Sequence, residues 1–203
     1  RDEAKQSIFN LTKIYQQIDF NEELNNKHMV TTGSFQWEGG VKDTRVIFYP
    51  NNKGKMSFLL TLRASYNGTH SSQISFPGGK FDLKDVSLDQ TALREAYEEI
   101  GIVKNDVSIF KKMTDVFIPP SNFVVTPYLS YLDYTPVFTK NHEVEDLIEV
   151  NVTDFLCDSA ITSTNLSTSY AKNIEVPCFK LNNYIVWGAT AMMLNEFISL
   201  IGS

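Results

Sequence analysis

Three glutamates, Glu95, Glu98 and Glu99, are spaced i, i+3 and i+4 near the end of a segment with helical character. This spacing places them on one face of an α-helix, where like charges repel one another. Acidic groups at the C-terminal end of a helix also oppose its dipole. Because carboxylate oxygens are preferred ligands of Mg²⁺ and Mn²⁺, the pattern predicts a divalent-cation site rather than a solvated helix end.

The elements that must hold this face are a strand, a turn and the helix itself. Ser87 is a good N-cap and Gln90 completes a capping box, while Gly101 lies where a glycine ends a helix. Before the helix, Gly78 and Gly79 follow a short strand and allow the backbone to turn sharply and to approach a ligand closely. We therefore expect a strand, a glycine turn and a helix to form one functional unit.

The rest of the chain alternates strands and helices irregularly, which favours a mixed sheet with helices on both sides. Alternating patterns predict strands at 44–49, 55–63, 73–76, 107–115, 122–132, 145–150 and 179–181. Helical patterns predict helices at 4–18, 87–100 and 185–201, and a short helix or turn at 153–158. The serine-, threonine- and asparagine-rich segment 159–173 is predicted to be a mobile loop. We expect a single domain over residues 1–203, with an N-terminal helical extension over 1–40.

Composition excludes several classes of protein. The 203 residues carry a net charge of −6, which argues against binding nucleic acid or an anionic membrane through a general positive field. Two cysteines at 157 and 178 match no disulfide framework or zinc motif and indicate a reducing compartment. No apolar run reaches the roughly 18 residues needed to span a bilayer, so we expect neither a membrane nor a nucleic acid as partner.

The segment 79–102, Gly79-x5-Asp85-x8-Arg94-Glu95-Ala96-Tyr97-Glu98-Glu99-Ile100-Gly101-Ile102, resembles the Nudix box. Nudix hydrolases cleave nucleoside diphosphates linked to another group. The general pattern has Glu where this chain has Asp85 and one residue fewer before Arg94. Both differences, together with the lead-in 73–85 and the stretches 125–128, 141–145 and 187–194, resemble the coenzyme A diphosphatase branch.

This resemblance implies an α/β/α sandwich with a mixed β-sheet and a catalytic group of Arg94, Glu95, Glu98 and Glu99. It implies that Glu95 and Glu99 bind Mg²⁺ or Mn²⁺, that Glu98 is a further metal ligand or the general base, and that Arg94 pairs with Asp85 or Glu98 to orient the loop. It also implies hydrolysis of coenzyme A or acyl-CoA to 3′,5′-ADP and 4′-phosphopantetheine or its acyl form.

Four residues are expected to contact the substrate: Arg63, Lys80, His70 and Gly79, the last of which could also offer its carbonyl to the metal. The branch usually carries an arginine and a glycine around its histidine, but here 67–73 reads Asn-Gly-Thr-His-Ser-Ser-Gln. If that arginine holds a substrate phosphate in the branch, its absence argues against recognition of coenzyme A by this chain. Glu143 and Glu145 are further candidates, beside Glu98, for the general base.

Two more functions compete with hydrolysis of coenzyme A. The same machinery could act on ADP-ribose, a dinucleotide or a capped RNA end, which the missing arginine favours. A Nudix-fold binding module without catalysis is the second, but it has no need of all three glutamates. We expect an intracellular protein, peroxisomal by resemblance, although the last three residues, Ile-Gly-Ser, are not a peroxisomal address.

Overall fold

A seven-stranded mixed sheet forms the centre of the computed structural model, which describes residues 40–65, 73–82, 85, 88–166 and 173–201. Strands β1 (Gly40–Pro50) and β6 (Phe123–Tyr131) run parallel at its middle. The other strands pair antiparallel: β2 (Met56–Arg63) with β1, β3 (Ile74–Ser75) and β7 (Val144–Asn151) with β2, and β4 (Ser108–Lys112) and β5 (Val116–Ile118) with β6.

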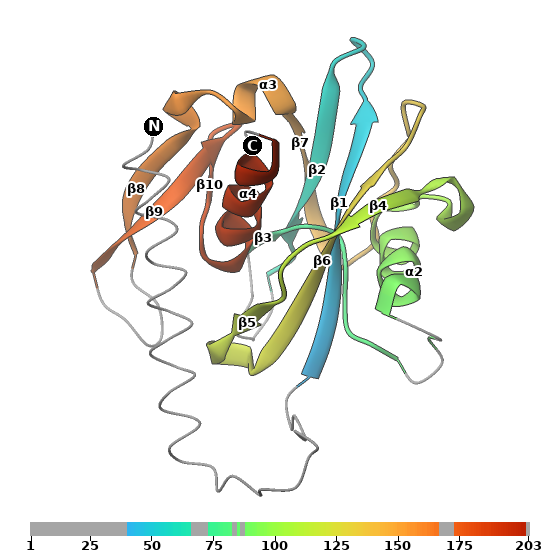
Figure 1. Cartoon of the computed structure of the whole chain (residues 1–203), viewed down its shortest axis with the longest axis horizontal. Helices are drawn as coiled ribbons and strands as arrows, with labels where there is room; N and C mark the ends of the chain where they lie inside the picture. The colour runs from blue at the N-terminus through green and yellow to red at the C-terminus, as the bar shows by residue number, and fades with distance from the viewer. Residues whose placement is uncertain (1–39, 66–72, 83–84, 86–87, 167–172, 202–203) are drawn as a thin grey trace, which may run out of the picture.

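Two helices lie on opposite faces of this sheet. Helix α2 (Leu88–Ile100) covers one face, and α4 (Gly188–Ile201) covers the other (Figure 1). Strand β1 serves both faces because successive side chains alternate: Ile47 packs in the cluster on the α2 side, and Val46 in the cluster on the α4 side. The predicted α/β/α arrangement with a mixed sheet is confirmed.

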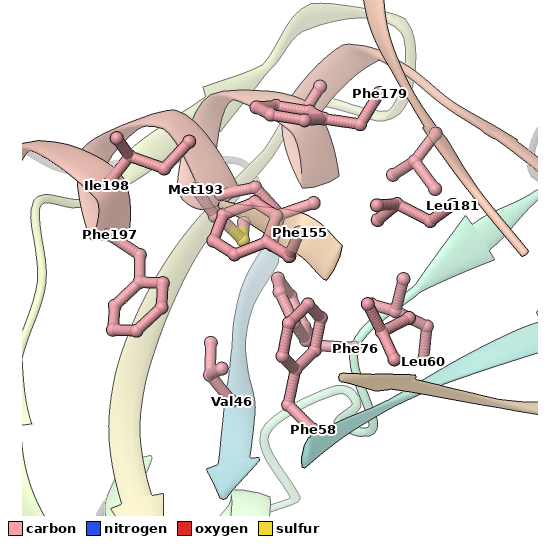
Figure 2. Packing of buried hydrophobic residues seen from close by; sticks show 14 of the residues in the cluster. Val46, Phe58, Leu60, Phe76, Phe155, Phe179, Leu181, Met193, Phe197 and Ile198 are labelled. Carbon is pink, nitrogen blue, oxygen red and sulfur yellow. The ribbon is translucent and has the colours of Figure 1, made fainter. Parts of the chain in front are cut away.

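The larger apolar cluster lies on the α4 side and is rich in phenylalanine (Figure 2). Phe155, from the short helix α3 (Val152–Phe155), is fully buried among Phe58, Phe179 and Phe197, with ring centroids 5.4, 5.5 and 5.8 Å away. Burying a ring of this size stabilises the fold by roughly 1.5–3 kcal/mol. This cluster fixes the sheet against which the functional elements are held.

A second, three-stranded antiparallel sheet of β8 (Ile161–Leu166), β9 (Ile174–Leu181) and β10 (Tyr184–Val186) corrects two expectations. Segment 159–173 was predicted to be a loop, but residues 161–166 pair with β9 over six positions. The β-branched residues Ile161, Thr162 and Thr164 favour such a strand although much of it is exposed, and polarity alone concealed it. The strand predicted at 179–181 is the end of a longer one, β9.

The remaining differences concern element boundaries. The closing helix was predicted from residue 185, but residues 184–186 form β10 and the helix begins at Gly188, whose φ is +63°. The strand predicted over 107–115 is β4, which ends at Lys112, with β5 following. The three short 3₁₀ turns in the described chain lie at Lys104–Asp106, Pro119–Ser121 and Asp158–Ala160. The predicted helix at 4–18 lies outside the described residues. Among the described helices, none has the length and apolar character to cross a membrane.

Candidate active site

Helix α2 presents its glutamates unequally. Ala92, Ala96 and Ile100 pack against the sheet at intervals of four residues, and this seam is almost completely buried. Glu99 lies next to the seam and is only 4% exposed, whereas the side chain of Glu98 is 51% exposed. The helix ends as predicted, because Gly101 has a φ of +76° and its N–H donates to the carbonyl of Tyr97.

The glycine turn lies directly against these glutamates. The N–H of Gly78 donates to Oε2 of Glu99 over 3.1 Å. A Cβ at Gly79 would lie 2.2 Å from the carboxyl carbon of Glu95, and a Cβ at Gly78 would lie 2.4 Å from the carbonyl oxygen of Asp43. The φ of Gly78, +152°, is also one that other residues rarely adopt. The Asp43 backbone therefore requires a glycine at 78, whereas Gly79 leaves room for the Glu95 carboxylate.

Arg94 clamps the loop to the helix, as the sequence predicted. Its Nε and Nη2 donate to the two oxygens of Asp85, each over 2.9 Å, and Nη2 also reaches the carbonyl of Lys80. Its Nη1 bonds Glu95 at 2.9 Å and Glu98 at 3.2 Å. This fork of hydrogen bonds holds the pKa of Asp85 well below its usual range. Both expected partners of Arg94, Asp85 and Glu98, are present.

The carboxylates of Glu99 and Glu95 have fewer hydrogen-bond donors and positive charges around them than Asp85 has, so burial raises their pKa values. Burial raises the pKa of Glu99 to about 7, against the opposing effects of the Gly78 N–H and of Arg63. Burial also raises the pKa of Glu95, although Arg94 opposes this. The charges of Glu95 and Glu143 raise the pKa of Glu99 further. Taking such groups out of water disfavours their charged forms, so a cation between them would restore ionisation.

The donor set fits a hard divalent cation at Glu95 and Glu99, beside Gly79, against which the Glu95 carboxylate packs. The carbonyl of Gly79 accepts a hydrogen bond from the N–H of Asp43 at 3.2 Å and retains a second lone pair. In the described part of the chain, no three His, Cys, Asp or Glu side chains already converge as a metal site. Arg94 instead bonds both Glu95 and Glu98, so the role of Glu98 as a third ligand stays a prediction.

Arg63 lies at this site, where the sequence placed it. Its Nη1 is 3.8 Å from Oε1 of Glu99, and its Nη2 donates to Glu143 over 3.5 Å. A shift of register between Leu62 and Arg63 and a hydrogen bond from Ala64 N–H to the Glu143 carbonyl bring Glu143 there. Arg63 therefore lies between the carboxylates of Glu99 and Glu143.

Glu145, a further candidate for the general base, lies differently from Glu143. It is exposed on β7, and its carbonyl accepts a hydrogen bond from Lys140. The described contacts of Glu145 do not bring it to Arg63 or to α2. His70, expected to contact substrate, lies outside the described residues.

Two residues of β1 belong to the site and were not predicted. Asp43 is 1% exposed, and its Oδ2 accepts a hydrogen bond from the N–H of Ala92 on α2. Within the described chain, its Oδ1 has no hydrogen-bond partner. Burial raises the pKa of Asp43 to about 7, and the charges of Glu95 and Asp85 add to this while Ala92 and Arg45 oppose it.

Lys42 is the second missed residue. Burial lowers its pKa, as do the charges of Arg63 and Lys80, while Glu95 and Glu99 raise it. Lys42 therefore shares the field of the site. The signal for both residues was the pair of charged positions at the start of a predicted apolar strand, but only the pairing of β1 with the glycine turn shows where they lie.

The strand, glycine turn and carboxylate-bearing helix form the arrangement that the resemblance to the Nudix box implied. The profile of the NUDIX domain matches residues 42–166. The chain belongs to the Nudix hydrolase family, whose members hydrolyse pyrophosphate bonds and generally use divalent metal ions. It is therefore a hydrolase that acts on nucleoside diphosphate derivatives.

Relatives and solved structures agree with this assignment. The uncharacterised Nudix hydrolase NudL of Yersinia pestis (strain Pestoides F) is 33% identical over 141 residues, which span 69% of this chain and 70% of that protein. A Nudix hydrolase from M. smegmatis, RenU, has a TM-score of 0.56 at 16% identity, covering 85% of this chain and 91% of its own. A MutT/nudix family protein from Enterococcus faecalis has a TM-score of 0.53 at 15% identity, covering 100% of this chain and 75% of its own. At these identities the structures show the fold alone.

Proposed function

We propose that this enzyme hydrolyses the diphosphate bond of coenzyme A or acyl-CoA, giving 3′,5′-ADP and 4′-phosphopantetheine or its acyl form. Residues 73–85, together with the stretches 125–128, 141–145 and 187–194 outside the box, support this branch by resemblance. The observation that carries the hydrolytic part is Glu99, which is buried beside Glu95 and short of positive charge. A binding module would have no need to retain such a costly carboxylate.

The chain's own residues account for positioning and proton transfer. Arg63 can contact a phosphoryl oxygen, and Glu143, 49% exposed and adjacent to Arg63, can accept a proton from water. The water oxygen bonds to one phosphorus, the P–O bond to the bridging oxygen breaks, and that oxygen leaves on the other phosphate. A bound Mg²⁺ or Mn²⁺, held by Glu95 and Glu99, would polarise the phosphoryl oxygens and lower the pKa of a bound water.

The test is a substrate panel with Mg²⁺ or Mn²⁺ and the full chain: coenzyme A, dephospho-coenzyme A, ADP-ribose, a dinucleotide and capped RNA. We expect coenzyme A to give the highest kcat/KM. Faster cleavage of any other member would replace coenzyme A as the substrate, and binding without hydrolysis throughout would overturn the assignment as an enzyme.

A second candidate, another nucleoside diphosphate derivative, has one observation in its favour. The arginine and glycine that the branch carries around its histidine are replaced in the segment 67–73. The panel separates the two candidates directly. A peroxisomal location is proposed by resemblance to the coenzyme A branch alone, and imaging of the tagged full-length protein in its host cell would test it.

The identity of the base has its own comparison. Glu143→Gln is expected to lower kcat by roughly a hundredfold, in line with the loss of a general base. Glu145→Gln is expected to have little effect, because the described contacts of Glu145 do not place it at Arg63. Equal effects of the two substitutions would assign the proton transfer to another group, Glu98 being the remaining candidate.

A further inference from the structure

Two lysines face each other beside the glycine turn. Lys42 on β1 and Lys80 form an antiparallel bridge, and both ammonium groups lie over the ring of Phe123, at 4.3 and 5.5 Å from its centroid. Like charges directly opposite on paired strands destabilise a sheet. Attraction to the ring returns only about 0.5–1 kcal/mol per cation at an exposed site.

The ring that holds these lysines is itself fixed in place. Phe123 pairs with Gly40 in the parallel ladder of β1 and β6. A Cβ at Gly40 would lie 1.9 Å from an edge atom of the Phe123 ring, so the ring packs directly against the Gly40 backbone. Since the ring packs on backbone and carries two cations, its part is to position the ammonium groups rather than to stack on a base.

Among the residues that the structure describes, no carboxylate pairs with these two ammonium groups. Over the described residues, neither Lys42 nor Lys80 forms an ion pair, whereas Arg63 is paired with Glu99 and Glu143. The carboxylates of Glu95 and Glu99 act on Lys42 only through their field. The lysine pair is therefore a separate cationic group next to the metal-binding carboxylates.

We propose that Lys42 and Lys80 bind a phosphomonoester on the nucleotide half of the substrate, apart from the diphosphate that is cut. This proposal rests on the proposed function and names the group that selects its substrate. A phosphomonoester carries a charge of about −1.5 to −2 near neutral pH, which matches two ammonium groups. The diphosphate has its own partners in Arg63 and a cation at Glu95 and Glu99. The lysine pair would bind the 3′-phosphate of coenzyme A.

Binding of two nucleotides to the full chain with Mg²⁺ tests this independently of turnover. By calorimetry, the wild-type protein is expected to bind 3′,5′-ADP at least roughly tenfold more tightly than AMP, the value of one charge-assisted hydrogen bond. Lys42→Gln and Lys80→Gln should each remove most of this preference and leave AMP binding little changed. Lys42→Arg should keep it, because the charge is kept.

Lys53→Gln is the matched control, since Lys53 is exposed in the turn after the other end of β1 and its loss removes one charge far from Phe123. Equal affinity of the wild type for both nucleotides would overturn the proposal. Equal weakening of both nucleotides in the lysine variants would overturn it as well, because the lysines would then bind a phosphate common to both. Failure of the proposed function would show instead as absence of hydrolysis in the substrate panel.

Discussion

Asp85, which precedes α2, and Glu99, which lies near the end of α2, have equally buried side chains, yet their surroundings are opposite. Their side chains are 6% and 5% exposed. Asp85 accepts two hydrogen bonds from Arg94, one from a backbone N–H and one from a threonine hydroxyl, and its pKa is held well below its usual range. Glu99 accepts one backbone N–H and faces Arg63 at 3.8 Å, and burial raises its pKa to about 7. The number of hydrogen-bond donors, and not the degree of burial, therefore explains why their pKa values differ.

The difference shows how this part of the fold divides its work. The pair of Asp85 and Arg94 is complete within the protein, so it fixes the loop to the helix and leaves little charge for a ligand. Glu99 has been removed from water without full compensation, which is costly unless another positive charge is added. Asp85 therefore holds the loop in place, whereas Glu99 has the surroundings that favour binding of a cation.

Replacing Glu99 with glutamine tests the carboxylate that lacks full compensation, and it should have the largest effect on activity. Glutamine keeps the shape and can still accept from Gly78, but it removes the negative charge. Since preorganised electrostatic groups are worth about a hundredfold to a thousandfold each, kcat should fall by about a thousandfold. Steady-state hydrolysis measures this. Glu98→Gln should cost less, because Glu98 is half exposed and bonded to Arg94.

Two controls accompany the Glu99 variant. Glu175→Gln removes an exposed carboxylate on β9 and should leave activity unchanged. Addition of Mg²⁺ should raise the melting temperature of the wild type and not that of Glu99→Gln, because a ligand that binds only the folded state stabilises it. Activity of Glu99→Gln within tenfold of wild type would remove Glu99 from the catalytic group.

The two glycines of the turn give the next contrast. Gly79→Ala places a methyl group against the Glu95 carboxylate, the end of a flexible side chain, so the fold should persist while Glu95 is displaced. We expect kcat/KM to fall roughly tenfold to a hundredfold, as for a misplaced catalytic group. Gly78→Ala meets the Asp43 backbone instead, so it should lower the yield of folded protein. Circular dichroism and kinetics of both variants distinguish the outcomes, and a reversed pattern would contradict the assignment.

Some residues of the site could be predicted from the sequence, and others could not. The i, i+3, i+4 glutamates, the glycine pair and the capped helix were visible, because helical periodicity and turn chemistry are local. Arg63 and Lys80, expected to contact the substrate, lie near these groups, and their contact with substrate stays a prediction. Asp43 and Lys42 were missed because their positions depend on the pairing of β1 with a turn more than thirty residues away, which no local pattern encodes.

The fold divides in the same way. Helix α2 begins at Leu88 and ends at Ile100, very close to the prediction, since the capping-box pattern and the terminal glycine are local signals in the sequence. Strand β8 was missed because its polar residues are typical of a loop, and its pairing with β9 supplies the order. Local chemistry predicted the elements with strong end signals, and tertiary pairing decided the rest.

Weakening the pair of Asp85 and Arg94 should affect the stability of the fold more than the electrostatics of the site. Arg94→Lys keeps the charge but loses the planar fork that grips both oxygens of Asp85. We expect the free energy of unfolding to fall by about 1–2 kcal/mol, as for loss of a strong, partly buried pair. Urea denaturation measures it. Lys112→Gln removes the exposed pair with Asp115 and should cost less than about 0.5 kcal/mol. Equal costs would mean that the clamp contributes no more than a surface pair.

A pH dependence of the metal-free protein, whose direction follows from Asp43, tests the same comparison without a substitution. Its pKa is about 7 in the folded state and 3.8 in a model peptide. Between these values the folded state holds a proton that the unfolded state releases, so the free energy of unfolding should decrease as pH rises. We expect a loss on the order of 1–3 kcal/mol from pH 5 to 8, to which Glu99 adds in the same direction.

Asp85 acts with the opposite sign, because its pKa is lowered in the folded state. Its contribution is present at neutral pH and is lost only below about pH 4. Asp43→Asn should therefore flatten the loss between pH 5 and 8, whereas Asp85→Asn should lower stability across that range without changing its slope. Urea titrations of both variants at several pH values measure these slopes. If the wild type is as stable at pH 8 as at pH 5, burial of Asp43 and Glu99 is compensated by charge within the protein. The distinction between Asp85 and Glu99 would then fail.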